Sequence, residues 1–383
     1  MRISLRFFSL LALLIAGSAS ILAQADDPFP DFNYRIYQGN MKLTAQVVQN
    51  GQVVTDAIVA VYCGDEIRGK KPVGNGTNPN LVYLTIYGNN TQEPQYLYFK
   101  VYANGIIFTY NPESPLTYTF DGGVGSDAEP YIITLPLSLA NKAENTETLT
   151  TWNGQTCDVV LAGRTLSRDG KWNTLCLPFD LSAEELAGSE LAGAEIRTLS
   201  STAFADGTLT LNFTPAAPAE GAVTAIQAGT PYIVRWPTPE ETNLANPVFE
   251  DVTIKNVTAD VETDCVNFVG TFSPTNIFTT EKTNLYLGSD NKLYYPWADG
   301  MTSFNINSCR AYFQLKGLTA GDPDIEGGIK AFELNFDEET TFIQHIAAEK
   351  SNGVWYDLSG HKVYGKPVQR GIYFSKGRKI FYN

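Results

Sequence analysis

Short runs of strand-forming residues, each followed by turn residues, recur along nearly the whole chain. Asn50-Gly51 separates the runs 41–48 and 58–63, and both turn residues accept the positive φ that a tight β-hairpin requires. Further runs lie at 81–87, 96–102, 106–110, 116–120 and 131–135. Because this spacing is typical of β-sandwiches, we predict an all-β fold of tandem sandwich-like domains with a few short helices.

The 383 residues are more than one average domain needs, since about 150 residues is typical of a domain. A stretch rich in Asn, Glu and Thr separates the first series of strands from the next and is interpreted as a linker. The predicted parts are an N-terminal Ig-like β-sandwich (31–136), a linker (137–151), a second mostly-β domain (152–337), a linker (338–353) and a small C-terminal β module (354–383).

Two short helices are expected inside the second domain. Ser182-Ala183-Glu184-Glu185 has the spacing of a capping box, in which the Ser hydroxyl and the second Glu carboxylate satisfy free backbone N–H groups. Thr238-Pro239-Glu240-Glu241 repeats the pattern with Pro at the first helical position. These acidic residues therefore have a local structural role, which argues against a catalytic one.

The first twenty-five residues have the features of a cleavable signal peptide. Arg2 and Arg6 precede an apolar run at 7–16, which is too short to span a bilayer. Ala23-Gln24-Ala25 then supplies the small-x-small pattern of a signal peptidase site, with cleavage expected after Ala25. We predict a secreted or cell-surface protein that passes through the periplasm and is not an integral membrane protein.

The charge of the chain is unevenly distributed. The net charge is −14, yet residues 350–383 hold seven Lys or Arg against the single acid Asp357. The tail therefore carries +6 and the remainder −20. An acidic body repels nucleic acid, so no nucleic-acid partner is expected.

The cysteines and histidines offer little for catalysis or metal binding. Five Cys leave at least one without a partner inside the chain, and each lies in an apolar context that favours a small buried hydrophobe over a disulfide. No CxxC pair supports a zinc site, and we expect no cofactor. The only histidines, His345 and His361, lie outside the two large domains, and no GxSxG, HExxH or phosphate-binding loop occurs.

Candidate ligand contacts come from acidic and aromatic residues. Asp65 and Glu66, beside Arg68, are the most suggestive charged group, although a turn with a surface ion pair is the favoured interpretation. The loop 121–129 offers oxygen ligands for calcium, but a plain Gly-rich turn is again favoured. Exposed rings stack on sugar faces or anchor protein partners. The aromatic candidates are Tyr294, Tyr295 and Trp297, together with the alternating Tyr83, Tyr87, Tyr96, Tyr98 and Tyr102.

The C-terminal residues resemble the sorting module of proteins exported by the type IX secretion system of Gram-negative bacteria. The residues that carry this resemblance are Tyr356, Asp357, Leu358, Gly360, Val363, Gly371, Tyr373, Lys376 and Lys379. The resemblance implies delivery across the outer membrane by the type IX machinery. The stretches 172–179, 228–233, 270–274 and 310–313, and in the first domain 61–69, are similar to modules of exported proteins of the same bacteria, which imply no established activity.

These features favour a non-catalytic secreted or cell-surface protein, adhesin-like or binding glycans or host and surface proteins. Two alternatives stay open. One is a secreted hydrolase that uses carboxylates on a glycan or a peptide. The other is a structural protein of the cell envelope.

Overall fold

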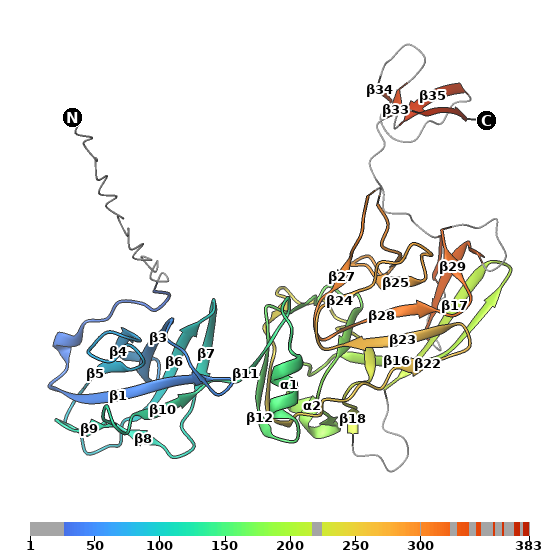
Figure 1. The fold of residues 1–383 in the computed structure, drawn as a ribbon. Helices are drawn as coiled ribbons and strands as arrows, with labels where there is room; N and C mark the ends of the chain where they lie inside the picture. Colours follow the sequence, from blue (N-terminus) through green and yellow to red (C-terminus); the bar gives the residue numbers. More distant parts are fainter. Residues whose placement is uncertain are drawn as a thin grey trace, which may run out of the picture. The chain divides into compact units, whose positions relative to one another are not determined.

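The computed structural model describes residues 27–216, 224–298, 300–321 and 328–336, with the strand segments 342–345, 355–356, 362–363, 371–375 and 378–382 (Figure 1). The predicted signal peptide and its cleavage residues Ala23 and Ala25 lie outside this range. Strands dominate the described residues, whose α-helices are α1 (Thr146–Trp152) and α2 (Ala183–Gly188). The predicted all-β class is confirmed. None of the described helices is long and apolar enough to cross a membrane.

The described residues form two compact units, one within 1–48 and 53–134 and the other within 49–52 and 135–383. The segment 137–151, which we expected to be a linker, belongs to the second unit. It contains β11 (Leu137–Ala140), which pairs in parallel with β12 (Thr156–Ala162), and most of α1. Leu137, Leu139 and Leu149 are buried in the second unit, so three leucines outweigh the polar composition of the segment.

The first unit consists of two sheets. In one, β1 (Gly39–Gln49) pairs with β5 (Val82–Gly88) antiparallel and with β10 (Tyr131–Thr134) and β9 (Gly123–Val124) in parallel, and β2 (Gln52–Val53) completes it. The other has the order β4 (Glu66–Pro72), β3 (Ala57–Cys63), β6 (Tyr96–Ala103) and β7 (Ile106–Tyr110), and β8 (Leu116–Thr117) also pairs with β6.

Alternating side chains build the core of this unit. Along β1, Met41, Leu43, Ala45 and Val47 are buried while the residues between them are more exposed, as the period of two of a strand requires. Phe99 on β6 meets Tyr131 on β10 with ring centroids 5.7 Å apart, which joins the two sheets. The predicted turn also forms, because Asn50 and Gly51 adopt φ values of 52° and 73°.

The second unit contains two larger sheets whose inner faces share one core. The six-stranded sheet has the order β14 (Asn173–Cys176), β19 (Pro231–Arg235), β16 (Glu195–Ala205), β17 (Thr208–Pro215), β31 (Ala331–Asn335) and β32 (Phe342–His345). The five-stranded sheet has the order β22 (Val261–Glu262), β23 (Val266–Thr271), β28 (Arg310–Leu315), β25 (Asn284–Leu287) and β26 (Leu293–Tyr294).

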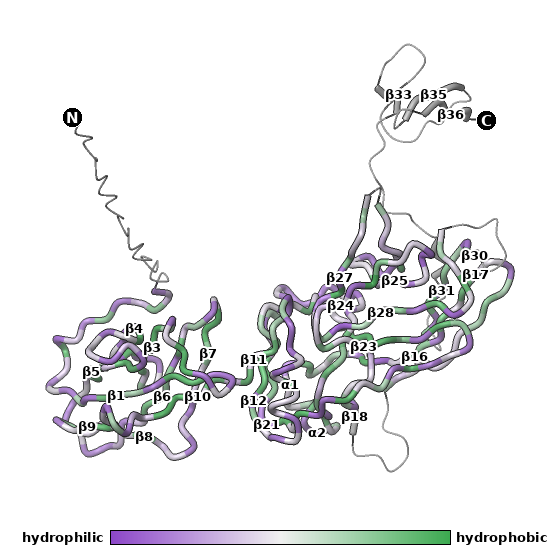
Figure 2. Tube along the Cα trace, viewed as in Figure 1, coloured by the Kyte–Doolittle hydropathy of each residue, from purple (hydrophilic) through white to green (hydrophobic). Residues whose placement is uncertain are grey.

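Aromatic rings fill the space between these two sheets. Phe268 and Phe313 stack with centroids 4.5 Å apart, and Phe213 from the other sheet meets each of them edge-on at 6.3 Å. Burial of such rings is the main source of stability in a core of this kind, at roughly 1.5–3 kcal/mol per large side chain. Figure 2 shows the hydrophobic segments along the strands, interrupted by hydrophilic turns.

A second core in this unit lies beneath the helices. It is built by β11, β12 and β21 (Val248–Thr253), by α1, and by the outer side chains of β14 and β19. Phe179 and Phe249 meet there at 5.1 Å. The remaining short strands pair as β13 (Thr165–Leu166) with β20 (Leu244–Ala245), β15 (Leu181–Ser182) with β18 (Thr224–Ile226), β24 (Thr275–Asn276) with β27 (Asn305–Ile306), and β29 (Thr319–Ala320) with β30 (Gly328–Ile329).

Of the two predicted capping boxes, one is confirmed and one is wrong. Ser182 Oγ accepts from the Glu185 N–H at 3.1 Å, and a Glu185 carboxylate oxygen accepts from the Ser182 N–H at 2.6 Å, which starts α2. Residues 238–241 form no helix. Their Glu240 carboxylate instead accepts from Arg168 at 2.5 Å, a long-range partner that no local pattern predicts.

The C-terminal segment forms a four-stranded antiparallel sheet with the order β34 (Lys362–Val363), β33 (Trp355–Tyr356), β35 (Gly371–Ser375) and β36 (Arg378–Tyr382). Of the residues that carry the sorting resemblance, those on strands are Tyr356, Val363, Gly371, Tyr373 and Lys379. Those outside the described residues are Asp357, Leu358, Gly360 and Lys376.

Candidate ligand-binding site

A pocket of about 330 Å³ lies on the first unit, at the start of β6. It is lined by Tyr96, Leu97, Tyr98, Asn111, Pro112 and Pro115. Two elements build it. The strand β6 supplies the tyrosines, and the connection from β7 to β8 supplies Asn111 and the prolines. The pairing of Tyr96 with Thr117 and of Leu97 with Leu116 brings this connection to the start of β6.

The two tyrosines of this pocket differ in freedom. Tyr96 is 58% exposed, the highest value among the exposed aromatic side chains of the described residues. Tyr98 is held from three sides: its ring stacks on Tyr62 at 5.4 Å, its hydroxyl donates to the Gly64 carbonyl at 3.0 Å, and it packs against the cluster around Phe29 and Ile58. The pocket thus has one rigid wall and one accessible ring.

The Tyr98 hydroxyl, at one side of this pocket, lies near an acidic residue. Burial raises the pKa of the Tyr98 hydroxyl, and the nearby Asp65 carboxylate raises it further. Asp65 is an exposed residue of the turn between β3 and β4. The candidate Asp65 therefore lies near the Tyr98 hydroxyl but does not line the pocket, whereas the Asn111 amide does.

The other two charged candidates have structural partners. Arg68 is buried and forms an ion pair of 3.0 Å with Glu66. Its guanidinium also donates to Gln95 at 3.2 Å and lies over the Tyr37 ring at 4.6 Å. Glu66 and Arg68 therefore form the ion pair of the favoured interpretation, but Arg68 is buried and does not lie at the surface.

The structure separates the three aromatic candidates of the second unit. Tyr294 stacks on Tyr286 at 5.8 Å, and Tyr286 stacks on Phe304 at 4.8 Å. Tyr294 also donates its hydroxyl to Asp290 at 2.7 Å, and burial together with this carboxylate raises its pKa to about 12. Rings stacked on one another cover their own faces, so this row offers no flat platform.

Tyr295 and Trp297 meet at a lysine. Lys282 Nζ lies 5.4 Å from the Tyr295 ring centroid and 4.6 Å from that of Trp297. Tyr295 packs against the sandwich core, while Trp297 is 42% exposed. The lysine covers part of the Trp297 ring.

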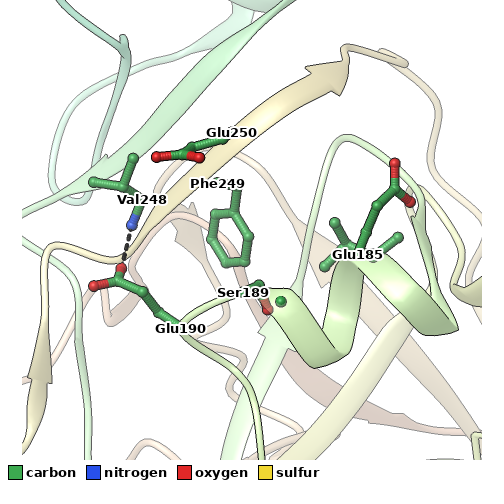
Figure 3. Close-up of a pocket in the computed structure, with 8 residues that line it drawn as sticks. Glu185, Ser189, Glu190, Val248, Phe249 and Glu250 are labelled. Carbon is green, nitrogen blue, oxygen red and sulfur yellow. Dashed lines mark hydrogen bonds between the residues drawn. The ribbon is translucent and has the colours of Figure 1, made fainter. Parts of the chain in front are cut away.

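A second pocket, of about 380 Å³, lies on the second unit between α2 and β21 (Figure 3). Glu185, Glu190 and Glu250 line it, as a carboxylate hydrolase would require. Glu185 is committed to capping α2, and the hydrogen bonds to Ser182 lower its pKa. Glu190 accepts from the Val248 N–H at 2.5 Å. In Figure 3, the Glu185 carboxylate points away from the other two. Two of the three carboxylates are therefore committed to backbone N–H groups.

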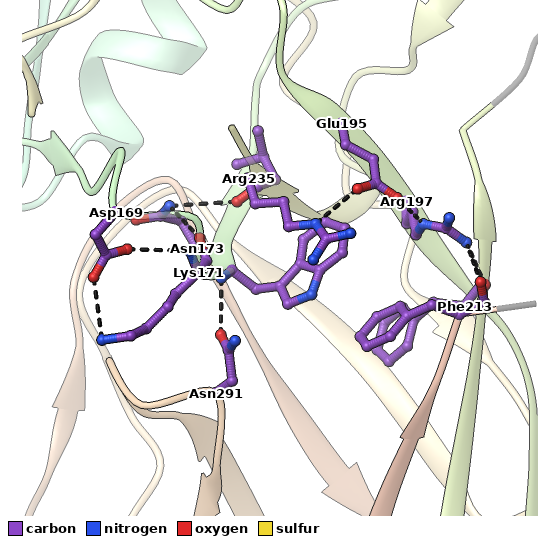
Figure 4. A network of polar contacts seen from close by, with 11 residues as sticks. Asp169, Lys171, Asn173, Glu195, Arg197, Phe213, Arg235 and Asn291 are labelled. Atoms are coloured by element: carbon purple, nitrogen blue, oxygen red, sulfur yellow. Dashed lines mark hydrogen bonds and ion pairs between the residues drawn. The ribbon is translucent and has the colours of Figure 1, made fainter. Parts of the chain in front are cut away.

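A network of polar contacts in the second unit includes Glu195, Arg197, Arg235 and Asn173 (Figure 4). Glu195 accepts from Arg197 at 2.5 Å and from Arg235 at 2.7 Å. Burial opposes ionisation of Glu195, but these hydrogen bonds outweigh it and hold its pKa below the usual range. Asn173 donates to the Ser167 carbonyl at 2.8 Å. The stretch 172–179, which carried part of the resemblance, thus serves the framework.

The loop 121–129 is the candidate calcium site. Among the described residues, no group of three or more His, Cys, Asp or Glu side chains is placed to hold a metal ion. In the loop 121–129, the Ser126 N–H donates to the Glu129 carbonyl at 2.9 Å and Asp127 accepts from Tyr83 at 2.9 Å. The segment thus contains the strand β9 followed by a turn that is closed by hydrogen bonds.

Sequence reasoning named Tyr96 and Tyr98 as aromatic candidates but missed Asn111, Pro112 and Pro115. Two prolines within five residues after a strand mark a rigid loop, yet nothing local shows that it reaches β6. A scan against protein-family models found no match for the chain, and a search of curated proteins found none either.

Proposed function

We propose that this chain is a non-catalytic secreted or cell-surface binding protein whose first unit binds carbohydrate in the Tyr96 pocket. The observation that carries the proposal is that the exposed Tyr96 lines this pocket. Small-ligand sites are typically apolar or aromatic clefts of about 300–1,000 Å³ with a few polar groups, and this pocket falls within that range.

The chemistry of the lining favours a sugar. A pyranose has an apolar face of C–H groups that packs on an aromatic ring, and hydroxyls around its edge that need hydrogen-bond partners. Tyr96 supplies the ring, and the Asn111 amide and the Asp65 carboxylate supply acceptors and donors nearby. Tyr98, fixed by Tyr62 and Gly64, keeps the pocket in shape before a ligand arrives.

Binding to a glycan array tests this proposal, followed by titration of any glycan that binds. Tyr96→Ala should weaken binding at least tenfold, because it removes the exposed stacking surface. Tyr34→Ala is the matched control: Tyr34 is 47% exposed on the same unit, on the short 3-10 helix η1 (Tyr34–Ile36), and does not line the pocket. Its affinity should equal that of the wild type.

The variant Trp297→Ala shows which of the two units binds the glycan, because Trp297 lies in the second unit. Unchanged affinity supports the pocket of the first unit, whereas a loss with Trp297→Ala but not with Tyr96→Ala would move the site to the second unit. Absence of any glycan binding, with binding to a matrix protein instead, would replace carbohydrate by a protein partner and contradict the proposal.

We further propose that the chain is exported by a type IX-like route. The support is the sequence pattern of residues 1–25 and of the C-terminal module, with the sheet β34-β33-β35-β36. Deletion of residues 355–383 should leave the protein in the periplasm, as detected by cell fractionation. Normal surface delivery of the truncated chain would refute the sorting role.

A further inference from the structure

Two of the five cysteines lie together inside the second unit. Cys176 ends β14, and Cys309 directly precedes β28. The Cys176 N–H donates to the Cys309 carbonyl at 3.4 Å, and both residues belong to the same buried cluster, with 0% and 2% exposure. This hydrogen bond lies outside the sheet ladders, and its N···O distance, added to the backbone bond lengths, limits the separation of the two α-carbons to about 7 Å. Disulfides join α-carbons about 4.4–6.8 Å apart, so a small approach of the two free thiols would allow the bond.

The surroundings of Cys309 are consistent with a fixed position. Its φ is 54°, in the left-handed region that residues other than Gly, Asn and Asp rarely adopt. A backbone in this region persists only where the surrounding structure holds it. Here Ser308 donates its N–H to the Asn141 carbonyl at 2.9 Å, and β28 pairs along its whole length with β23. These contacts hold the Cys309 backbone beside Cys176, at the end of β14.

We propose that Cys176 and Cys309 form a disulfide bond when the chain folds in an oxidising environment. The bond would join the end of β14, an edge strand of the six-stranded sheet, to the residue that directly precedes β28 in the five-stranded sheet. It would close a loop of about 130 residues, a length for which a cross-link restricts the unfolded chain strongly. In the cell, the bond would form only if the chain is exported to an oxidising compartment, as proposed above. In a redox buffer, it would form whether or not the export proposal holds.

The bond forms by exchange with a small-molecule disulfide such as oxidised glutathione. One cysteine thiolate attacks a glutathione sulfur, which releases one glutathione thiolate and leaves a mixed disulfide. The second cysteine thiolate then attacks the protein sulfur of that mixed disulfide and releases the second glutathione. The two protein thiols lose two protons and two electrons, and the glutathione disulfide gains them.

The folded core controls when this exchange happens. Burial raises the pKa of Cys176 well above that of a free thiol, with the neighbouring Cys309 as the next cause, and burial raises the pKa of Cys309 to about 12. The thiolate is the reactive form, so both groups are inert once the core has closed. Oxidation is therefore expected during folding and not in the folded, reduced protein.

The other three cysteines provide the contrast. Cys63, Cys157 and Cys265 are half-buried, and no backbone hydrogen bond among the described residues joins any of them to another cysteine. Cys63 lies in the first unit and the other two in the second. The odd number of cysteines is then explained by one bonded pair and three free thiols.

Refolding in a redox buffer tests the proposal. The full chain is reduced, unfolded and refolded with reduced and oxidised glutathione, then alkylated and digested without reduction for mass spectrometry. We expect one linked pair of peptides, containing Cys176 and Cys309, and alkylation of the other three thiols. Adding the same buffer to the folded, reduced protein should give the bond much more slowly.

Thermal unfolding gives a second measurement. The oxidised protein should melt about 5–10 °C above the same protein with a reductant. Cys176→Ala should abolish both the linked peptides and the effect of the reductant, whereas the matched Cys157→Ala should keep both. If Cys176→Ala does not fold, the peptide map of the wild type still decides. A natively refolded wild type in which all five thiols are alkylated, or in which another pair is linked, would overturn the proposal.

Discussion

The guanidinium of Arg235 lies over the ring of Trp172, 4.6 Å from the ring centroid. Trp172 is 5% exposed, stacks on Phe336 at 5.1 Å and donates its backbone N–H to Asn291 at 2.8 Å. The cation is held in turn by Glu195 (Figure 4). The buried Trp172 ring therefore contacts both a second ring and a cation, so its removal would leave a cavity in the second unit.

Trp172→Ala should therefore destabilise the second unit strongly. Removing a buried tryptophan typically costs about 3–5 kcal/mol of unfolding free energy. Trp297→Ala is the same substitution at a 42% exposed ring and should cost less than about 1 kcal/mol. Urea unfolding followed by circular dichroism measures both, and equal losses in the two variants would contradict the structural role of Trp172.

The ion pairs of Glu195 predict a dependence of stability on pH. Its pKa in the folded protein is lowered, so its contribution is present above the pKa of an unfolded Glu and is lost as the pH falls through the folded value. Glu195→Gln should cost roughly 1–3 kcal/mol at pH 7, because two arginines lose a charged partner. The loss relative to the wild type should shrink as the pH is lowered from 5 to 3. A difference in melting temperature that stays constant over this range would argue against the ion pairs as its cause.

The start of α2 depends on one hydroxyl. Ser182 Oγ satisfies the Glu185 N–H, and a short helix has few other sources of stability. Ser182→Ala should cost about 0.5–2 kcal/mol of unfolding free energy. Ser303→Ala, at an exposed serine of the same unit, should change it by less than about 0.5 kcal/mol. Chemical denaturation of both variants gives the comparison, and the expectation fails if the two are indistinguishable.

Two glycines of the second unit should respond to alanine in opposite ways. Gly229 has a φ of 76°, and an added Cβ would lie 2.2 Å from the Val257 carbonyl oxygen, so Gly229→Ala should destabilise by more than about 2 kcal/mol. Gly188 ends α2 with open space around it, and Gly188→Ala should be neutral or stabilise by up to about 1 kcal/mol. Melting temperatures of the purified variants test both signs. A well-folded Gly229→Ala protein with unchanged stability would show that the backbone there is free to move.

The sequence by itself determined the local structure. The all-β class, the Asn50-Gly51 turn and the Ser182 capping box each depend on residues within a few positions of one another, and periodicity and turn chemistry report on that range. The capping role of Glu185 also followed from its position three residues after Ser182. These predictions needed no knowledge of distant contacts.

Tertiary structure decided what distant segments do to one another. The composition of residues 137–151 is that of a polar linker. Three of its leucines are nevertheless buried in a core whose other residues come from segments far along the chain. Glu240 is drawn to Arg168 instead of capping a helix. Tyr96 is distinguished from the other tyrosines only by the loop that Pro112 and Pro115 bring beside it. Strand and helix signals are short-range, whereas pockets, ion pairs and cysteine neighbours arise from contacts between residues far apart in the sequence, which no local pattern specifies.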